Sequence, residues 1–239
     1  MKPIAILRFA AADGPAYFAE FISLAGKSFT EIRVDHGAHI PSDSRQFGGI
    51  ALMGGPMSVN DPLPWIPSVL ALIQDATSNN VPLIGHCLGG QLISKALGGS
   101  VGRSPKGKEI GWHAIQIQDT SLANEWFGRR EGFDVFQWHG EAFTLPAGST
   151  RIASSDYCEN QAFILGPHIG MQFHIEIDET TIENWCDGGS KEINAALKND
   201  PPHEAVMTSE NIKKRTPHAL PRMRLVADHL YHRWLLSAT

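Results

Sequence analysis

The chain has 239 residues, 42% of them hydrophobic, which is enough apolar material for a sizeable core. Its formal net charge is −5 at pH 7, and the short run Lys213-Lys214-Arg215 is its nearest approach to a basic patch. This composition argues against a nucleic acid or an anionic membrane as the main partner, and the lack of about 18 consecutive apolar residues predicts no membrane-spanning helix.

Short apolar segments alternate with amphipathic ones along the first half of the chain. The four predicted strands are Pro3–Phe9, Glu31–Val34, Gly49–Met53 and Val81–Ile84. The predicted helices are Pro15–Ala25, Trp65–Asn79 and Gln91–Leu97. Because apolar strands separated by helices form parallel sheets that are covered on both faces, this half predicts an α/β fold.

The second half changes to strands with short connections and ends in helices. The predicted strands are Trp112–Gln118, Phe133–Trp138, Arg151–Ser154, Ala162–Leu165 and Gly170–Ile175. The predicted helices are Glu179–Leu197 and Pro221–Leu236, with a loop at Asn199–Pro202 between them. The whole pattern predicts an α/β fold with an open, mostly parallel central sheet, helices on both faces and a smaller antiparallel strand region. We find no repeat or linker, so we expect a single domain over residues 1–239.

Residues 85–91 read Gly-His-Cys-Leu-Gly-Gly-Gln, between a predicted strand and a predicted helix. Cys87 therefore lies at a sharp strand-to-helix turn, where small neighbours permit a strained backbone and a close approach of substrate. The positive end of the helix dipole favours the thiolate, which is the nucleophilic form of cysteine. The alternative is a buried thiol that only packs, and this is what we expect for Cys158 and Cys186. Three cysteines also indicate a reducing compartment, and hence a cytoplasmic protein.

A second polar pair lies in Gln172-Phe173-His174-Ile175-Glu176, where we predict a strand. His174 and Glu176 are two residues apart, so their side chains point to the same face of that strand. They could be two metal ligands, a structural ion pair, or a general base and the carboxylate that orients it. A zinc site needs more ligands than this pair offers, so the presence of Cys87 favours the base and its carboxylate.

Gly54-Gly55-Pro56 follows a predicted strand and is either an ordinary turn or part of an oxyanion hole. In the second interpretation, the N–H groups of Gly55 and Leu88 stabilise the negative charge that develops on a substrate carbonyl oxygen. Leu88 comes directly after the candidate nucleophile, which is where such a donor is needed.

Two further histidines, His229 and His232, are three residues apart on a predicted helix. They could share a metal ion, but a metal site needs further ligands. We therefore interpret them as polar surface residues and predict neither a metal nor an organic cofactor.

Three motifs in this order resemble the class I (triad) glutamine amidotransferase family over residues 45–178. The motifs are Met53-Gly54-Gly55-Pro56, Gly85-His86-Cys87-Leu88-Gly89-Gly90-Gln91 and Gln172-Phe173-His174-Ile175-Glu176. The resemblance implies that Cys87 is the nucleophile, His174 the base and Glu176 its orienting carboxylate. It further implies that Gly55 and Leu88 form the oxyanion hole.

Two other segments are similar to those of stand-alone members that resemble the amidotransferase domain of GMP synthase. They are Met57-Ser58-Val59-Asn60-Asp61 and Trp138-His139-Gly140-Glu141. By this resemblance, Gln91, His139 and Glu141 contact the substrate.

The activity that the resemblance implies is hydrolysis of the γ-amide of glutamine through a cysteine thioester, with release of ammonia and glutamate. One alternative is a stand-alone γ-glutamyl peptidase that acts on γ-glutamyl compounds. The other is a non-catalytic regulatory or binding module on the same fold. The expected partners are a small-molecule substrate and, for the amidotransferase, a separate synthase subunit.

Overall fold

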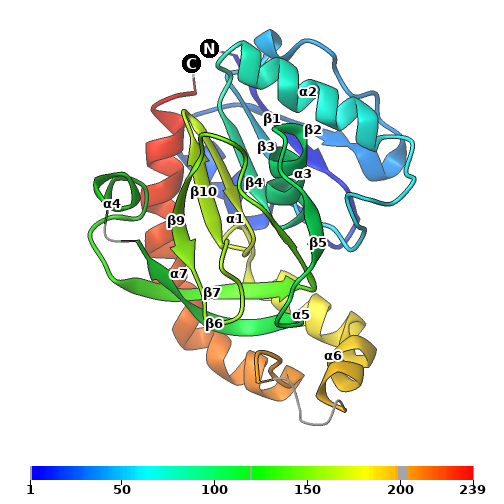
Figure 1. The fold of residues 1–239 in the computed structure, drawn as a ribbon, viewed down its shortest axis with the longest axis vertical. Helices are drawn as coiled ribbons and strands as arrows, with labels where there is room; N and C mark the ends of the chain where they lie inside the picture. Colours follow the sequence, from blue (N-terminus) through cyan, green and yellow to red (C-terminus); the bar gives the residue numbers. More distant parts are fainter. Residues whose placement is uncertain (1, 119, 199–203, 239) are drawn as a thin grey trace.

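The computed structural model describes residues 2–118, 120–198 and 204–238 (Figure 1). In these residues the main sheet has nine strands, in the order β2-β1-β3-β4-β11-β10-β9-β6-β7. The mutually parallel strands are β1 (Ile4–Arg8), β2 (Phe29–Arg33), β3 (Gly49–Leu52), β4 (Leu83–His86) and β11 (His168–Met171). The antiparallel strands are β10 (Ala162–Leu165), β9 (Thr150–Ser154), β6 (Glu109–Ile117) and β7 (Gly132–His139). The predicted α/β fold with an open central sheet is confirmed.

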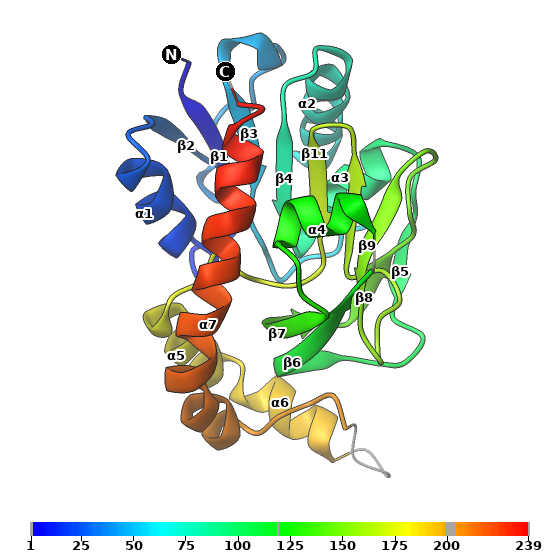
Figure 2. The ribbon, with the colours of Figure 1, turned by 90° about the vertical axis from the view of Figure 1, so that its left-hand side faces the viewer.

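Helices cover both faces of the sheet, as Figures 1 and 2 show. The helices concerned are α1 (Ala16–Leu24), α2 (Ile66–Ser78), α3 (Leu88–Ala96) and α7 (Ser209–Leu235). Strand β1 contributes Ile4 and Ile6 to the apolar cluster that contains α1 and α7, and Ala5 and Leu7 to the cluster that contains α2 and α3. Because successive side chains of a strand point to opposite faces, a continuous apolar run is what a strand buried on both sides requires.

The sequence patterns missed one short α-helix and two short strands. They are α4 (Ser121–Phe127), β5 (Val101–Arg103) and β8 (Glu141–Phe143). The two strands pair with each other as a small antiparallel sheet. Elements of this length hold too few residues to establish a hydrophobic period, so tertiary contacts decide them.

The prediction of one helix over Glu179–Leu197 is wrong, because the segment forms two helices. They are α5 (Glu179–Gly188) and α6 (Ser190–Leu197). The break falls at Gly189, where an added Cβ would lie 2.3 Å from Cζ2 of Trp138. The close approach of the chain to this indole therefore requires a glycine, and the helical path changes there.

Helix α7 begins at Ser209, twelve residues before the predicted start at Pro221. Its N-cap is Thr208, whose side chain accepts a hydrogen bond from the N–H of Asn211. Pro217 and Pro221 both lie inside the helix. Proline weakens a helix interior, so the burial of one apolar face of α7 against the sheet must compensate for it. Helix propensity does not include this tertiary contribution, so the sequence pattern could not predict the first twelve residues of the helix.

Two other boundaries matter for the site. Helix α3 begins at Leu88, directly after Cys87, and strand β11 ends at Met171, before His174.

The predicted loop Asn199–Pro202 falls outside the described residues. Among the helices that the structure describes, none is long and apolar enough to span a membrane. The single domain stays a prediction.

Candidate active site

Cys87 lies at the junction of β4 and α3 in a strained backbone conformation, with φ 49° and ψ −106°. A non-glycine residue with positive φ costs on the order of 1–3 kcal/mol, and such strain persists only where the surrounding structure imposes it. Here the N–H of Cys87 donates to the carbonyl of Met171 at 2.9 Å, and the N–H of Gln91 donates to the carbonyl of Cys87 at 3.0 Å. The turn is therefore held by β11 on one side and by the first turn of α3 on the other.

Glycines allow helix α3 to lie directly on the strands beneath it. A Cβ at Gly85 would lie 2.5 Å from the carbonyl carbon of Gly89, and a Cβ at Gly89 would lie 2.1 Å from the carbonyl oxygen of Leu52. A Cβ at Gly90 would lie 2.3 Å from the carbonyl oxygen of Met171. These contacts are to backbone atoms, so the glycines that flank Cys87 are required for the close packing that positions it.

His174 and Glu176 meet by a short hydrogen bond. Nδ1 of His174 lies 2.6 Å from Oε1 of Glu176, and Oε2 of Glu176 accepts the N–H of Ile175 at 2.9 Å. His174 lies beyond the end of β11 and forms an isolated bridge with Phe136, to whose carbonyl its N–H donates at 2.9 Å. The two side chains point the same way, as predicted, although the predicted strand does not extend to them.

Burial and charge act in opposite directions on this pair. Burial favours the neutral imidazole, but Glu176 and Cys87 outweigh it and hold the pKa of His174 well above its usual range. Burial likewise opposes the charged carboxylate, yet His174 and His86 lower the pKa of Glu176. The surroundings thus stabilise the protonated imidazole that a general base forms when it accepts a proton.

Two cavities meet at Cys87. The His174 cavity, about 230 Å³, is lined by residues that include Asp13, Cys87, His174 and Trp185. The Gln91 cavity, about 570 Å³, has Cys87, Gln91, Arg103, Lys108 and Glu141 in its lining. The sulfur is therefore accessible to a ligand that extends into both spaces.

Gly55 lines both cavities, and Leu88 provides the first N–H of α3. The first N–H groups of a helix have no partner within it, so the N–H of Leu88 is available to an oxyanion. A Cβ at Gly55 would lie 2.7 Å from Sδ of Met57 and 2.8 Å from Cδ2 of Leu88. Both predicted oxyanion donors thus lie beside Cys87, and their role stays a prediction.

The three predicted substrate contacts lie at the Gln91 cavity and are tied to one another. Nε2 of Gln91 donates to the carbonyl of Glu141 at 3.2 Å and to Oε1 of Gln172 at 3.3 Å. Nδ1 of His139 lies 3.0 Å from the same carbonyl. The Glu141 carboxylate accepts from the hydroxyl of Ser58 at 2.8 Å. All three residues line the cavity, but both ring nitrogens of His139 are already engaged, by the Glu141 carbonyl and by the Glu109 carboxylate.

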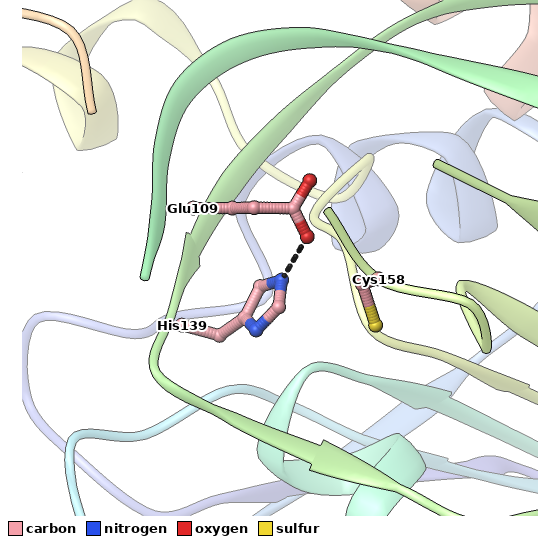
Figure 3. Close-up of side chains that lie close together, drawn as sticks. All are labelled: Glu109, His139 and Cys158. Carbon is pink, nitrogen blue, oxygen red and sulfur yellow. Dashed lines mark hydrogen bonds and ion pairs between the residues drawn. The ribbon is translucent and has the colours of Figure 1, made fainter. Parts of the chain in front are cut away.

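Figure 3 shows that the imidazole of His139 faces Glu109 in the interior, with Cys158 beside them. Possible ligand atoms of the three residues lie within 4.8 Å of one another. The Glu109 carboxylate, however, already accepts hydrogen bonds at 2.9 Å from His139, Gln161 and Ser155. Burial also raises the pKa of Cys158 to about 12, which keeps its thiol protonated. These contacts are those of a buried hydrogen-bond network that holds the segment carrying Glu141, and they do not favour a metal ion.

Sequence reasoning missed Asp13, which lines the His174 cavity. Burial raises the pKa of this carboxyl to about 6, with His174 lowering it and Glu176 raising it. Asp13 lies 161 positions before His174, after β1, and no motif in the sequence surrounds it. Only the fold brings it to the site. Trp185, also missed, packs edge-to-face on His174 with ring centroids 4.7 Å apart.

The remaining histidines of interest lie outside both cavities. His86 is fully buried, and its Nε2 lies 3.2 Å from the hydroxyl of Tyr231 on α7. His229 and His232 use a ring nitrogen to contact the carbonyls of Glu125 and Asp228 at 3.0 and 2.8 Å. Each thus has a packing or hydrogen-bonding role within the fold.

Comparison with known proteins shows what this chain is similar to. A sequence model of the family "Glutamine amidotransferase class-I" matches residues 23–184. The crystal structure of a glutamine amido transferase from Methylobacillus flagellatus is 39% identical and superposes with a TM-score of 0.96. That likeness covers 100% of this chain and 96% of the other.

Two curated proteins illustrate the range of relatives. Gamma-glutamyl peptidase 3 of Arabidopsis thaliana is 28% identical over 161 residues, which are 64% of this chain and 65% of the peptidase. The glutamine-hydrolyzing GMP synthase of Vibrio vulnificus is 32% identical over 145 residues, which are 58% of this chain and 26% of the synthase. The chain thus spans less than two thirds of the length of either protein.

Proposed function

Since this chain belongs to the class I glutamine amidotransferase family, we propose that it hydrolyses the γ-amide of glutamine and releases ammonia and glutamate. One observation supports this most. Cys87, on a strained turn, lines the same cavity as His174, whose Nδ1 hydrogen-bonds to Glu176. A thiol, a base and a carboxylate that orients the base are the parts of a nucleophilic triad.

In the proposed reaction, His174 takes the proton of the Cys87 thiol, and the sulfur attacks the γ-carbonyl carbon of the substrate. The carbonyl oxygen becomes negatively charged and accepts hydrogen bonds from the N–H groups of Gly55 and Leu88. The C–N bond then breaks, and His174 gives its proton to the leaving nitrogen. A γ-glutamyl thioester remains, which a water molecule hydrolyses with His174 again as base. Glu176 holds the imidazole in the required orientation throughout.

The Gln91 cavity is the proposed binding site of the glutamyl group. Its lining holds Arg103 and Lys108 as cations and Glu141 as an anion. The α-amino and α-carboxylate groups of glutamine carry opposite charges, so groups of both signs suit it. Gln91 adds amide hydrogen-bonding capacity at the same wall.

A stand-alone γ-glutamyl peptidase is the second candidate. The observation that favours it is the His174 cavity, which leaves room beside Cys87 for a leaving group larger than ammonia. The similarity to gamma-glutamyl peptidase 3 points in the same direction. A third interpretation, a non-catalytic module, is disfavoured because Cys87 and His174 line one cavity and Glu176 hydrogen-bonds to His174. For the amidotransferase, the similarity to GMP synthase supports a separate synthase subunit as partner.

The test is steady-state hydrolysis of glutamine and of γ-glutamyl dipeptides by the isolated protein, followed through released ammonia, amine and glutamate. Cys87→Ala should abolish turnover, whereas Cys186→Ala, a buried core cysteine outside both cavities, should leave it unchanged. Hydrolysis of dipeptides with little action on glutamine would favour the peptidase. Ammonia release only after addition of a partner fraction would favour the subunit. No hydrolysis of any γ-glutamyl compound by reduced protein would contradict both.

A further inference from the structure

The position of His174 assigns a role to each cavity, given the proposed function on which this step rests. The base must give its proton to the leaving nitrogen, so it has to lie on the leaving-group side of the scissile bond. His174 lines the His174 cavity and is not among the lining residues of the Gln91 cavity. The Gln91 cavity therefore takes the γ-glutamyl group, and the His174 cavity takes the group that leaves.

The His174 cavity is larger than ammonia needs. A molecule of the size of water takes up about 30 Å³ in the liquid, and ammonia is of similar size. The cavity measures about 230 Å³. Space of this kind next to a scissile bond suits an amine that carries a substituent of several heavy atoms.

The walls of this cavity are mainly apolar. Trp138 and Trp185 form one side, with ring centroids 6.1 Å apart and planes at 75°. Gly188, the last residue of α5, and Gly189, which lies between α5 and α6, also line the cavity. Indole rings offer a flat apolar surface to a hydrocarbon and an attractive face to a cation.

Two carboxyl groups at this cavity oppose an anionic leaving group, and the charge of His174 is paired with Glu176. Asp13 and Glu192 line it, and no Lys or Arg is among its lining residues in the part of the chain that the structure describes. Glu192 is already engaged by Lys108 and by Nε1 of Trp138. The carboxylate of Asp13, by contrast, makes no hydrogen bond within residues 2–118, 120–198 and 204–238. With a pKa of about 6, Asp13 is ionised at neutral pH and above.

We propose that the substrates of this enzyme include γ-glutamyl amides of apolar amines that carry no carboxylate, and that Asp13 selects against amino-acid leaving groups. In this reaction the C–N bond of the amide breaks and the C–S bond to Cys87 forms. The proton of the thiol passes through His174 to the nitrogen, so the amine leaves neutral. Water then hydrolyses the thioester to glutamate, and no further reactant is needed.

A matched pair of substrates tests the proposal. γ-Glutamyl-phenethylamide and γ-glutamyl-phenylalanine differ only in the carboxylate of the leaving group. At pH 8 the kcat/KM of the phenethylamide should exceed that of the phenylalanine compound by about tenfold or more, which corresponds to ~1.4 kcal/mol at the transition state. Glutamine is measured beside them as the reference for the proposed function.

Two variants locate the selectivity. Asp13→Asn should reduce the ratio between the matched substrates about threefold to tenfold, the range that a partly screened contact between like charges supplies. Gly188→Leu should lower the ratio of phenethylamide to glutamine kcat/KM, because Gly188 lines the cavity and an added Cβ there meets no atom within 4 Å, so a larger side chain can take up part of the space. Asp187→Asn is the matched control, since this exposed residue pairs with Lys213 and is absent from the cavity lining. It should change neither ratio.

The outcomes separate this proposal from the proposed function. Hydrolysis of glutamine together with equal or better hydrolysis of γ-glutamyl-phenylalanine would overturn the selectivity and leave the proposed function standing. An unchanged ratio in Asp13→Asn would likewise overturn the role of Asp13. No hydrolysis of any of the three compounds by reduced protein would overturn the proposed function, and the proposal with it.

Discussion

Oε1 of Glu176 lies 2.6 Å from Nδ1 of His174, and the other carboxylate oxygen accepts a backbone N–H at 2.9 Å. Each carboxylate oxygen thus accepts a hydrogen bond, and the carboxylate cannot rotate without losing one of them. A carboxylate held in this way selects the tautomer in which Nε2 of His174 is free to accept a proton.

Glu176→Gln should therefore weaken catalysis less than loss of the reacting groups. We expect Cys87→Ala and His174→Ala to lower kcat by about 10⁴-fold or more, and Glu176→Gln to cost at least about tenfold less than either. Single-turnover and steady-state kinetics on variants with unchanged circular dichroism would measure this. Equal inactivation of a folded Glu176→Gln would indicate that Glu176 takes a more direct part.

Cys87 should react with iodoacetamide or a glutamine-like electrophile well before the other two cysteines. It lines both cavities, whereas burial raises the pKa of Cys158 to about 12 and also raises that of Cys186. Thiolate fraction and access govern the rate of alkylation. Peptide mass mapping after partial labelling would show the order, and equal labelling of all three in folded protein would contradict Cys87 as the reactive thiol.

Gly55→Val should reduce turnover more than stability. The added side chain would meet Sδ of Met57 and Cδ2 of Leu88, which are flexible ends that can shift, but it would also displace the N–H of Gly55. Loss of one oxyanion donor costs about 3 kcal/mol at the transition state, or roughly 10²-fold in kcat. Normal kcat in this variant would place the donor elsewhere.

Gly89→Ala should destabilise the fold strongly, because its Cβ would lie 2.1 Å from the carbonyl oxygen of Leu52. The obstacle is a backbone atom of β3, so relief requires that α3 move away from the sheet. We expect a loss at the upper end of the about 1–3 kcal/mol typical of overpacking, or more. Gly102→Ala is the control, since nothing lies within 4 Å of the position that its added methyl group would take. Urea unfolding would compare the two.

His168 should make stability depend on pH between about 6.5 and 4. Burial lowers its pKa from 6.5 to about 4, and Nδ1 accepts the N–H of Leu83 at 3.2 Å. In this window the unfolded chain binds a proton that the folded chain does not, so stability rises with pH and is lost as pH falls. The full effect is about 3 kcal/mol.

His168→Gln should flatten this acid-side slope in urea unfolding measured at several pH values. His39→Gln is the matched control and should leave the slope unchanged, since this exposed histidine makes no side-chain hydrogen bond or ion pair among the described residues. An equally steep slope in His168→Gln would show that other groups cause the acid sensitivity.

Sequence patterns alone predicted the alternation of strands and helices in the first half and the turn that carries Cys87. They could do so because these signals are local. A strand buried on both faces needs a continuous apolar run such as Ile4–Leu7, and a strand-to-helix turn packed against a sheet needs small residues such as Gly85 and Gly89. The same reasoning placed His174 and Glu176 on one side of an extended segment.

The tertiary structure alone decided what surrounds those residues. Asp13 reaches the cavity from a loop after β1, the imidazole of His139 turns inward to Glu109, and the helix predicted over Glu179–Leu197 breaks where Gly189 meets Trp138. Each of these depends on contacts between segments far apart in the chain. Local propensity and periodicity carry no information about such contacts, because the energy that fixes them comes from packing and charge in the assembled fold.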